Sequence, residues 1–220
     1  MTKLYFIRHG KTVWNAEGRF QGSGGDSPLL PESIHQIEQL GNHLRCVKFE
    51  HAFTSPIKRA VDTAEQTLDY LEHKPELTVQ EGLKEFSFGV WEGKTFSEVK
   101  KNWGDMYEAS RHHPEKFDAS LVSGAETFPE VQLRFKKAVQ EAINVYGGTD
   151  VNLIFFSHGS ALTAGMGGLL NIPLDHLRDR GGLGNTSTSI LETTDGEHFT
   201  ELLRNDTGYL DELADESNTI

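Results

Sequence analysis

The chain has 220 residues and no long polar linker, so we expect a single domain over residues 1–220. Its 33 acidic residues outnumber its 21 Lys and Arg, and the net charge of −12 repels nucleic acids and anionic membranes. The lone cysteine, Cys46, excludes an intramolecular disulfide and a cysteine-rich zinc site. Because a signal-peptide pattern and a membrane-length apolar run are also lacking, we expect a cytoplasmic protein.

Two short apolar stretches, Lys3 to Ile7 and Val151 to Phe156, predict buried strands because they are rich in β-branched and aromatic residues. A histidine–glycine pair follows each stretch, His9-Gly10 near the start of the chain and His158-Gly159 near its end. Ligands of α/β folds bind at the carboxyl edge of the sheet. We therefore expect the two strands to lie side by side and both histidines to face one pocket.

After the first strand comes a glycine-rich loop, Gly18 to Asp26. An amphipathic helix is predicted next, with an apolar face of Ile34, Ile37, Leu40, Gly41 and Leu44. A short strand ends at Ala52-Phe53, and Ser55-Pro56 then predicts a helix with Ser55 as its N-cap. The buried face of that helix is expected at Ile57, Ala60, Val61, Ala64, Leu68 and Leu71.

A third strand is predicted over Leu77 to Val79, followed by a loop from Glu81 to Gly93. From about residue 94 to residue 124 the pattern weakens into short helices, which we interpret as an inserted cap. Thr127 and Glu130 have the spacing of a capping box at the start of a long helix. Another helix is expected to begin near Ser160, and strands over residues 187–192 and 198–203 complete the fold. The acidic tail, about residues 206–220, is expected to be solvated and partly disordered.

His9 has the surroundings that a nucleophile needs. A histidine that attacks phosphorus must be neutral and must be oriented through its other ring nitrogen. Arg8 would lower the histidine pKa and bind phosphate oxygens, and Gly10 would let the backbone approach an oxyanion closely. The tripeptide alone also fits a core or surface histidine, and its place at a strand end favours the catalytic interpretation.

Arg59 is expected in the first turns of its helix, almost opposite the apolar face. Together with Lys58 it places two cations where the helix dipole disfavours positive charge. A phosphate bound there would resolve the conflict, because free N–H groups and arginine would both face it. An exposed arginine bonded to water is the alternative.

Several motifs follow one another along nearly the whole chain: Leu4 to Thr12 with Trp14-Asn15, Phe20 to Gly22 with Asp26 to Leu29, Thr54 to Ala60 with Thr63-Ala64, Leu83 to Phe86 with Phe88-Gly89 and Trp91 to Gly93, Ser157 to Gly159, and Gly184 to Thr186. In this order they resemble the histidine phosphatase superfamily, in its phosphoglycerate mutase-like branch. Each motif is weak alone, whereas the ordered set is specific. The resemblance implies a three-layer α/β/α sandwich with a mostly parallel central sheet and an inserted cap.

The resemblance also implies roles for individual residues. His9 would accept the phosphoryl group, Glu85 would donate a proton to the leaving group, and Arg8, Arg59 and His158 would bind the phosphoryl group. Further phosphate contacts are implied for Asn15, Gln21, Gly22 and the Gly159 backbone. Read without the resemblance, Glu85 is one loop carboxylate among many.

The implied activity is hydrolysis of a small phosphorylated metabolite through a phosphohistidine, with no metal and no cofactor. Cofactor-dependent phosphoglycerate mutase-type transfer is an alternative, although the cap lacks the neighbouring arginines and the proline-rich stretch that we associate with glycolytic mutases. A non-catalytic phosphate-binding regulator is disfavoured because binding needs neither nucleophile nor acid. A metallophosphatase is disfavoured because no His/Asp cluster has convincing ligand spacing. The natural substrate and the oligomeric state stay open, a homodimer included.

Overall fold

The computed structural model describes residues 1–211. Residues 212–220, which make up most of the predicted acidic tail, lie outside the described part of the chain. Within that part, no helix is both long enough and apolar enough to cross a membrane.

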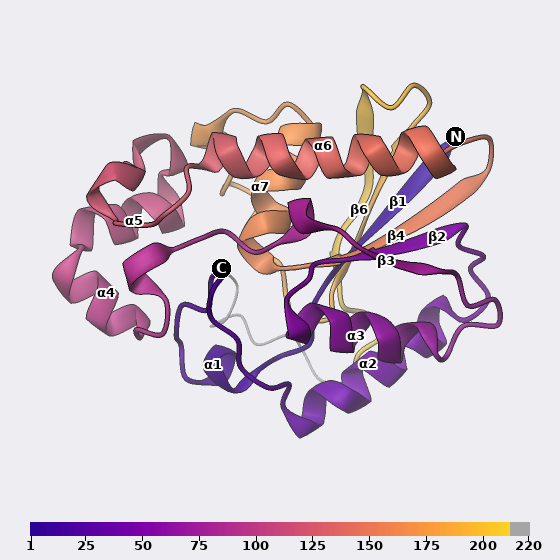
Figure 1. Cartoon of the computed structure of the whole chain (residues 1–220), viewed down its shortest axis with the longest axis horizontal. Coiled ribbons are helices and arrows are strands. Elements are labelled where there is room, and N and C mark those ends of the chain that lie inside the picture. The colour runs from indigo at the N-terminus through magenta and orange to yellow at the C-terminus, as the bar shows by residue number, and fades with distance from the viewer. Residues whose placement is uncertain (212–220) are drawn as a thin grey trace.

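A six-stranded mixed sheet forms the centre of the fold, in the order β3-β2-β4-β1-β5-β6 (Figure 1). Neighbouring strands from β3 to β1 are parallel, whereas β5 is antiparallel to both β1 and β6. The mostly parallel sheet predicted from the resemblance is therefore confirmed. The strands are β1 (Thr2–Arg8), β2 (His51–Thr54), β3 (Leu77–Val79), β4 (Val151–Ser157), β5 (Thr188–Thr193) and β6 (Phe199–Asp206).

Helices cover both faces of the sheet and give the predicted three layers (Figure 1). On one face, Phe6 and Phe155 of adjacent strands pack with α6 (Phe128–Tyr146) and α7 (Gly159–Leu169). On the other face, Ile7 and Phe156 pack with α2 (Pro31–Leu44) and α3 (Lys58–Leu68). Alternate residues of one strand thus enter different cores, as the period of a strand requires. The predicted capping box of α6 is present, with Thr127 as N-cap and Glu130 in the first turn.

Short helices fill the segment that the sequence predicts as a cap. These are α4 (Phe96–Asn102), α5 (Gly104–His112), and 3₁₀ turns at Pro114–Lys116 and Ala119–Leu121. Val99 and Val122 from this segment share an aromatic-rich cluster with Phe20, Phe86 and Trp91. The segment is therefore joined to the loops after β1 and β3 by a hydrophobic core of its own.

The structure differs from the sequence predictions in several details. Ile34 is 46% exposed, and Ser33 is buried in its place because its hydroxyl donates a hydrogen bond to the Lys11 carbonyl at 2.6 Å. Helix α3 begins at Lys58, so Ser55 precedes the helix and is not its N-cap. A short helix, α1 (Val13–Ala16), lies between β1 and the glycine-rich loop, where the sequence analysis assigned no helix.

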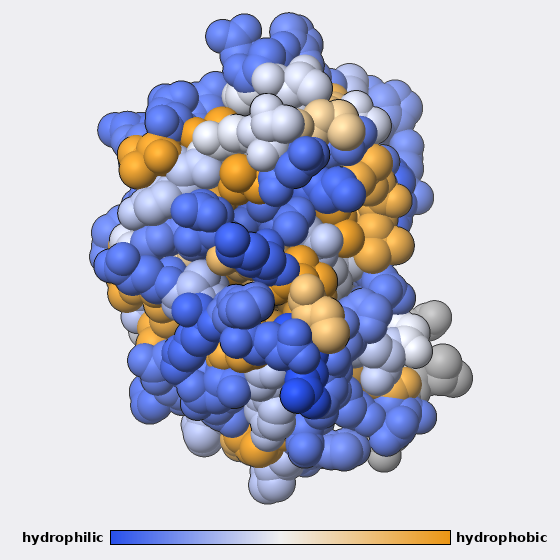
Figure 2. Space-filling view, turned by 90° about the vertical axis from the view of Figure 1, so that its right-hand side faces the viewer, coloured by the Kyte–Doolittle hydropathy of each residue, from blue (hydrophilic) through white to orange (hydrophobic). Residues whose placement is uncertain are grey.

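The surface seen from the right-hand side of Figure 1, where the N-terminus lies, is mostly hydrophilic, with hydrophobic residues in separate groups (Figure 2). The carboxyl ends of β1 and β4, where the predicted site residues lie, are at the other end of these strands.

Candidate active site

The two histidines lie together at the carboxyl edge of the sheet. Strands β1 and β4 are parallel neighbours that pair Arg8 with Ser157, and each strand is followed at once by its histidine. The ring centroids of His9 and His158 are 5.1 Å apart, and the residues are 2% and 0% exposed. The prediction that the two strands lie side by side is confirmed.

The neighbours of His9 locate the proton on its ring. Its Nδ1 lies 2.7 Å from the Gly10 carbonyl oxygen, which can only accept, so Nδ1 carries the proton. Its Nε2 is therefore unprotonated, and its lone pair accepts a hydrogen bond from the Nε–H of Arg59 at 3.2 Å. Burial, the charge of Arg59 and the charge of Arg8 lower the pKa of His9 well below its ordinary value. The ring is neutral, and Nε2 is the atom that can act as a nucleophile.

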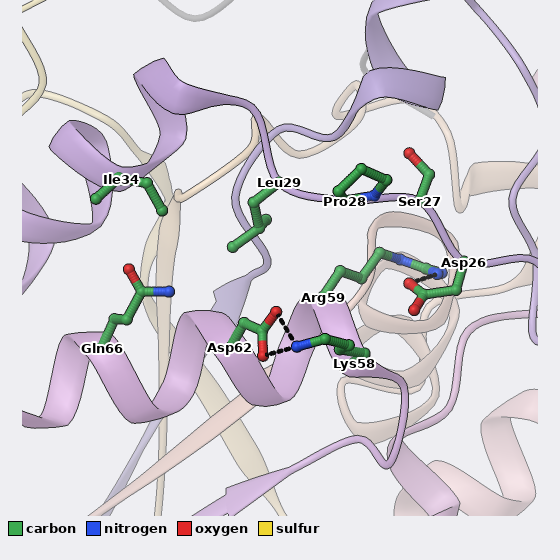
Figure 3. A pocket seen from close by; sticks show the side chains of 9 residues that line it. All are labelled: Asp26, Ser27, Pro28, Leu29, Ile34, Lys58, Arg59, Asp62 and Gln66. Carbon is green, nitrogen blue, oxygen red and sulfur yellow. Dashed lines mark hydrogen bonds and ion pairs between the residues drawn. The ribbon is translucent and has the colours of Figure 1, made fainter.

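Arg59 connects His9 to the glycine-rich loop. Its terminal nitrogens donate to the carbonyls of Gly25 at 2.7 Å and Gly22 at 2.9 Å. Asp26 lies 3.6 Å from the same guanidinium (Figure 3). Because Arg59 is only 1% exposed, the alternative of a solvated arginine is wrong.

A cavity of about 380 Å³ lies beside Arg59, between residues 26–29 and helices α2 and α3 (Figure 3). Leu29 and Ile34 form its apolar side, and Lys58 is paired with Asp62 at 2.6 Å on the opposite side. Lys58, the cation at the start of α3, thus has a carboxylate partner one helical turn further along the chain.

His158 has one ring nitrogen bound and one without a partner. Its Nε2 lies 2.7 Å from the Ser55 hydroxyl, which also accepts from the Ile57 N–H at 3.3 Å. Among the described residues, the buried Nδ1 has no hydrogen-bond partner. Burial, Arg59, His9 and Arg8 lower the pKa of His158 well below its ordinary value. An oxyanion between the histidines would supply the partner that Nδ1 lacks.

Glu85 caps the N-terminus of α7. One carboxylate oxygen accepts from the N–H groups of Ala161 at 2.7 Å and Phe86 at 2.8 Å, and the other accepts from Ser160 at 3.3 Å. At the start of the same helix, a Cβ on Gly159 would lie 3.2 Å from the Arg8 guanidinium carbon, so glycine lets that arginine pack against the helix. Glu85 and Arg8 are therefore held at one helix end.

The remaining predicted residues support the loop. The Thr12 hydroxyl lies 3.0 Å from Oδ1 of Asn15 and 3.0 Å from Oε1 of Gln21. Both amides are nearly fully buried. Gly22 has a left-handed backbone, with φ of 62°, and its carbonyl faces Arg59. These residues join the loop to the segment after β1 and to Arg59.

Three polar side chains around the site were not assigned from the sequence. Ser55 binds His158, Asn185 donates to the His9 carbonyl at 3.0 Å, and Arg134 donates to the Glu85 carbonyl at 3.0 Å. Arg134 and Asn185 bind main-chain carbonyls far away in sequence, so periodicity gives no signal for them. Ser55 and Asn185 lie within two of the matched motifs, Thr54 to Ala60 and Gly184 to Thr186, and this is the sequence signal that could have found them.

The chemistry available here is that of binding a compact anion. Burial is the main cause that lowers the pKa of Arg8 to about 10; the charge of Glu85 opposes this shift, and the charges of Arg59 and Arg111 add to it. Guanidinium groups remain charged at neutral pH, and forked N–H groups match phosphate oxygens. Over residues 1–211, no three His, Cys, Asp or Glu side chains gather as a metal site would require.

Comparisons with known proteins give similar chains. A family model described as "Histidine phosphatase superfamily (branch 1)" matches residues 4–207. One relative, described as a probable phosphoglycerate mutase GpmB of Citrobacter koseri, is 30% identical over 176 residues, 79% of this chain and 77% of that protein. The solved structure of Bacillus stearothermophilus YhfR has 31% identity and a TM-score of 0.85, covering 95% of this chain and 99% of that one. A phosphoserine phosphatase mutant of Entamoeba histolytica, in complex with phosphoserine, has 27% identity and a TM-score of 0.79, covering 96% of this chain and 100% of that one.

Proposed function

Because the chain belongs to the histidine phosphatase superfamily, branch 1, we propose that it is a phosphatase that hydrolyses a small phosphomonoester through a phosphohistidine at His9. One observation carries the proposal: the unprotonated Nε2 of His9 lies 3.2 Å from the Arg59 guanidinium, with His158 beside it. A neutral nucleophile next to a fixed cation is what attack on a phosphate dianion needs.

The first step forms a bond between His9 Nε2 and phosphorus while the bond from phosphorus to the ester oxygen breaks. Arg8, Arg59 and the Nδ1 of His158 hold the non-bridging oxygens, where negative charge must be neutralised. Glu85 gives its proton to the departing alkoxide. The Glu85 oxygen that carries this proton is the one bound to Ser160, because its 3.3 Å bond is the longest of the three.

In the second step the Glu85 carboxylate takes a proton from water, and the resulting hydroxide attacks phosphorus. The bond to Nε2 breaks, inorganic phosphate leaves, and His9 and Glu85 return to their starting states. Residues 94–124 serve as the cap that admits this water. This role of residues 94–124 is supported by the position of Val99, which belongs to one hydrophobic cluster with Phe20 and Phe86 of the two loops next to the site.

The proposal includes a small phosphorylated substrate and a cytoplasmic location. Mutase activity is the second candidate, because a relative that is 30% identical is described as a probable phosphoglycerate mutase. In that reaction a second substrate molecule would replace water as the acceptor of the phosphoryl group in the second step, and the same residues would be used.

Purified protein incubated with p-nitrophenyl phosphate tests the proposal. We expect release of phosphate, and a loss of at least roughly 10³-fold in His9→Ala. The same change at exposed His73 is the matched control. A panel of phosphorylated metabolites, with and without 2,3-bisphosphoglycerate, separates the two candidates: phosphate release supports the phosphatase, and conversion of one phosphoglycerate isomer into the other supports the mutase. Full activity in His9→Ala would refute both.

A further inference from the structure

Glu85 lies on a segment without regular structure. It stands between two 3₁₀ turns, Glu81–Leu83 and Gly89–Trp91, and residues 84–88 belong to no helix or strand. Backbone groups in such a segment need hydrogen-bond partners from other elements when they are withdrawn from water. The contacts that fix the backbone of Glu85 must therefore come from elsewhere in the fold.

Arg134 of α6 supplies these contacts. Its Nη1 donates to the carbonyls of Gly82 at 2.9 Å and Lys84 at 2.7 Å. Its Nη2 donates to the carbonyl of Glu85 itself at 3.0 Å. A single guanidinium thus binds three main-chain carbonyls of the segment that carries the proposed acid.

Glu126, two residues before the start of α6, orients this guanidinium. Nε of Arg134 donates to Oε1 of Glu126 at 2.8 Å, and Nη2 donates to Oε2 at 2.9 Å, which is the paired geometry of a strong arginine–carboxylate contact. Together with the three carbonyls, these bonds use all five N–H groups of the side chain. Every donor of Arg134 is bound to the protein itself, as suits a residue that fixes structure and does not bind substrate.

Glu126 also holds the chain on the other side of Glu85. Its Oε2 accepts from the Ser87 N–H at 2.8 Å, and its own N–H donates to the Ser87 carbonyl at 2.9 Å. Phe135, the residue after Arg134, is fully buried, so the ion pair is attached to an anchored part of α6. The segment is therefore fixed before and after Glu85 by one ion pair.

The position of a general acid decides how well it works. The acid must lie within hydrogen-bond distance of the oxygen that receives its proton, and a displacement of about 1 Å can lower a rate by roughly 10²-fold. We propose that Arg134 is a positioning residue that fixes the backbone of residues 82–85, so that the carboxyl group of Glu85 reaches the oxygen of the leaving group. The inference rests on the proposed function, in which Glu85 is the acid, and adds a residue that acts through that acid.

An electrostatic effect of Arg134 on His158 is the alternative. Burial is the main cause that lowers the pKa of His158, and the charge of Arg134 adds to the shift. A change at His158 would alter the binding of the phosphoryl group, which all phosphomonoesters share. A change at Glu85 depends on the leaving group, because only a strongly basic leaving group needs the proton.

The test compares benzyl phosphate with p-nitrophenyl phosphate, two substrates that carry similar aromatic rings. Benzyl alkoxide is a strong base, whereas p-nitrophenolate is a weak one. Release of benzyl alcohol or p-nitrophenol in a single turnover, with enzyme in excess, measures the first step for each. In Arg134→Met, which keeps the apolar stem and removes every N–H donor, we expect the rate with benzyl phosphate to fall at least roughly tenfold more than the rate with p-nitrophenyl phosphate.

Two further variants of the ion pair support the comparison. Arg134→Lys should recover part of the loss, because an ammonium group still donates to carbonyls although it lacks the planar fork. Glu126→Gln removes the charge that orients Arg134, and we expect a smaller change in the same direction. It replaces Arg134→Met in the comparison if that variant does not fold.

The control variant is Lys137→Met. It removes an exposed cation of the same helix that lies 4.0 Å from Glu141, and we expect it to leave both rates unchanged. The Glu85→Gln variant supplies the second comparison. If Arg134 acts through the acid, adding Arg134→Met to Glu85→Gln should not change the ratio of the two rates any further.

An equal loss on both substrates in Arg134→Met, or no loss on either, would overturn the proposal. A further change of the ratio when Arg134→Met is added to Glu85→Gln would overturn it too. Failure of the proposed function looks different: the wild type would then release no p-nitrophenol, or Glu85→Gln alone would lower both rates equally.

Discussion

His9 and His158 are buried in the neutral state, and this links the site to the stability of the fold. Their folded-state pKa values lie well below the ordinary value of about 6.5 for histidine. Between the folded pKa and the unfolded pKa, the unfolded chain binds more protons than the native protein. The contribution of these histidines to stability is therefore complete above the unfolded pKa and is lost as the pH falls from there toward the folded pKa.

His9→Gln removes one of these groups, so the free energy of unfolding should fall less steeply with decreasing pH in the variant than in the wild type. Chemical denaturation from about pH 8 to about pH 5.5 measures both slopes, and one histidine can account for at most about 1.4 kcal/mol per pH unit. Equal slopes would show that His9 takes up its proton as readily in the folded protein as in the unfolded chain.

Replacing Glu85 by Gln removes the transferable proton but keeps an oxygen that can accept the N–H groups of Ala161 and Phe86. We expect kcat on an alkyl phosphate to fall by roughly 10²–10⁴ while binding survives. An aryl phosphate should lose less, because its leaving group is a weaker base. Single-turnover rates of His9 phosphorylation by the two substrates make the comparison, and an equal loss on both would mean that Glu85 only positions the substrate.

Individual side chains were predictable from the sequence where a motif fixes both the residue and its place at a strand end, as for His9 and His158. The burial of Arg59 was not predictable from its helix, because that burial depends on the carbonyls of Gly22 and Gly25 in another segment. Arg134 gave no signal for a similar reason: its partner, the Glu85 carbonyl, is 49 positions away. Long-range hydrogen bonds to the main chain leave no pattern in the sequence.

Close packing between α6 and α7 depends on a glycine. A Cβ at Gly165 would lie 2.3 Å from the Phe135 ring, and Phe135 is fully buried. By contrast, a Cβ at Gly104, at the start of α5, would meet nothing within 4 Å. The two glycines have opposite consequences for an added methyl group.

Gly165→Ala should therefore lower the free energy of unfolding by roughly 1–3 kcal/mol, because overpacking exceeds the gain of about 1 kcal/mol in helix propensity. Gly104→Ala is the matched control and should be neutral or stabilising by up to about 1 kcal/mol. Denaturant titrations of both variants measure the difference. If Gly165→Ala is as stable as Gly104→Ala, then the two helices are not packed as closely as described.

The strands were predictable because buried apolar runs bounded by polar residues are short and distinct, as for β1 and β4. Helix faces were predictable only in part. The helical period of the apolar residues alone assigns Ile34 and Val61 to the buried faces of their helices. In the structure, Ser33 and Thr63 are buried instead. The Ser33 hydroxyl donates to the Lys11 carbonyl, and the Thr63 hydroxyl accepts from the Gly10 N–H, so hydrogen bonds to the loop after β1 favour these residues on the inward faces.

The protein as a whole is acidic, with a net charge of −12, while its buried site gathers arginines. Burial disfavours the charged form of Arg8 and of Arg59, as their lowered pKa values show. A bound oxyanion interacts favourably with both charges in the native state only. The ligand should consequently stabilise the fold.

Inorganic phosphate should raise the midpoint of thermal unfolding. At 100 times its dissociation constant, the gain is about 2.7 kcal/mol, or roughly 5–10 °C for a chain of this length. Sodium chloride at matched ionic strength is the control for screening, and Arg59→Met should abolish most of the shift. A shift of the same size in Arg59→Met would place the bound phosphate elsewhere.

Covalent phosphorylation of His9 distinguishes the proposed mechanism from any account in which the site only binds phosphate. Wild-type protein mixed with an activated aryl phosphate and quenched within one turnover should carry one phosphoryl group, stable in base and labile in acid, as expected for a phosphoramidate, and peptide mapping should place it on His9. His9→Ala should carry none, whereas Glu85→Gln should still be labelled. Turnover of the wild type with no such label, or a label on another residue, would contradict the mechanism.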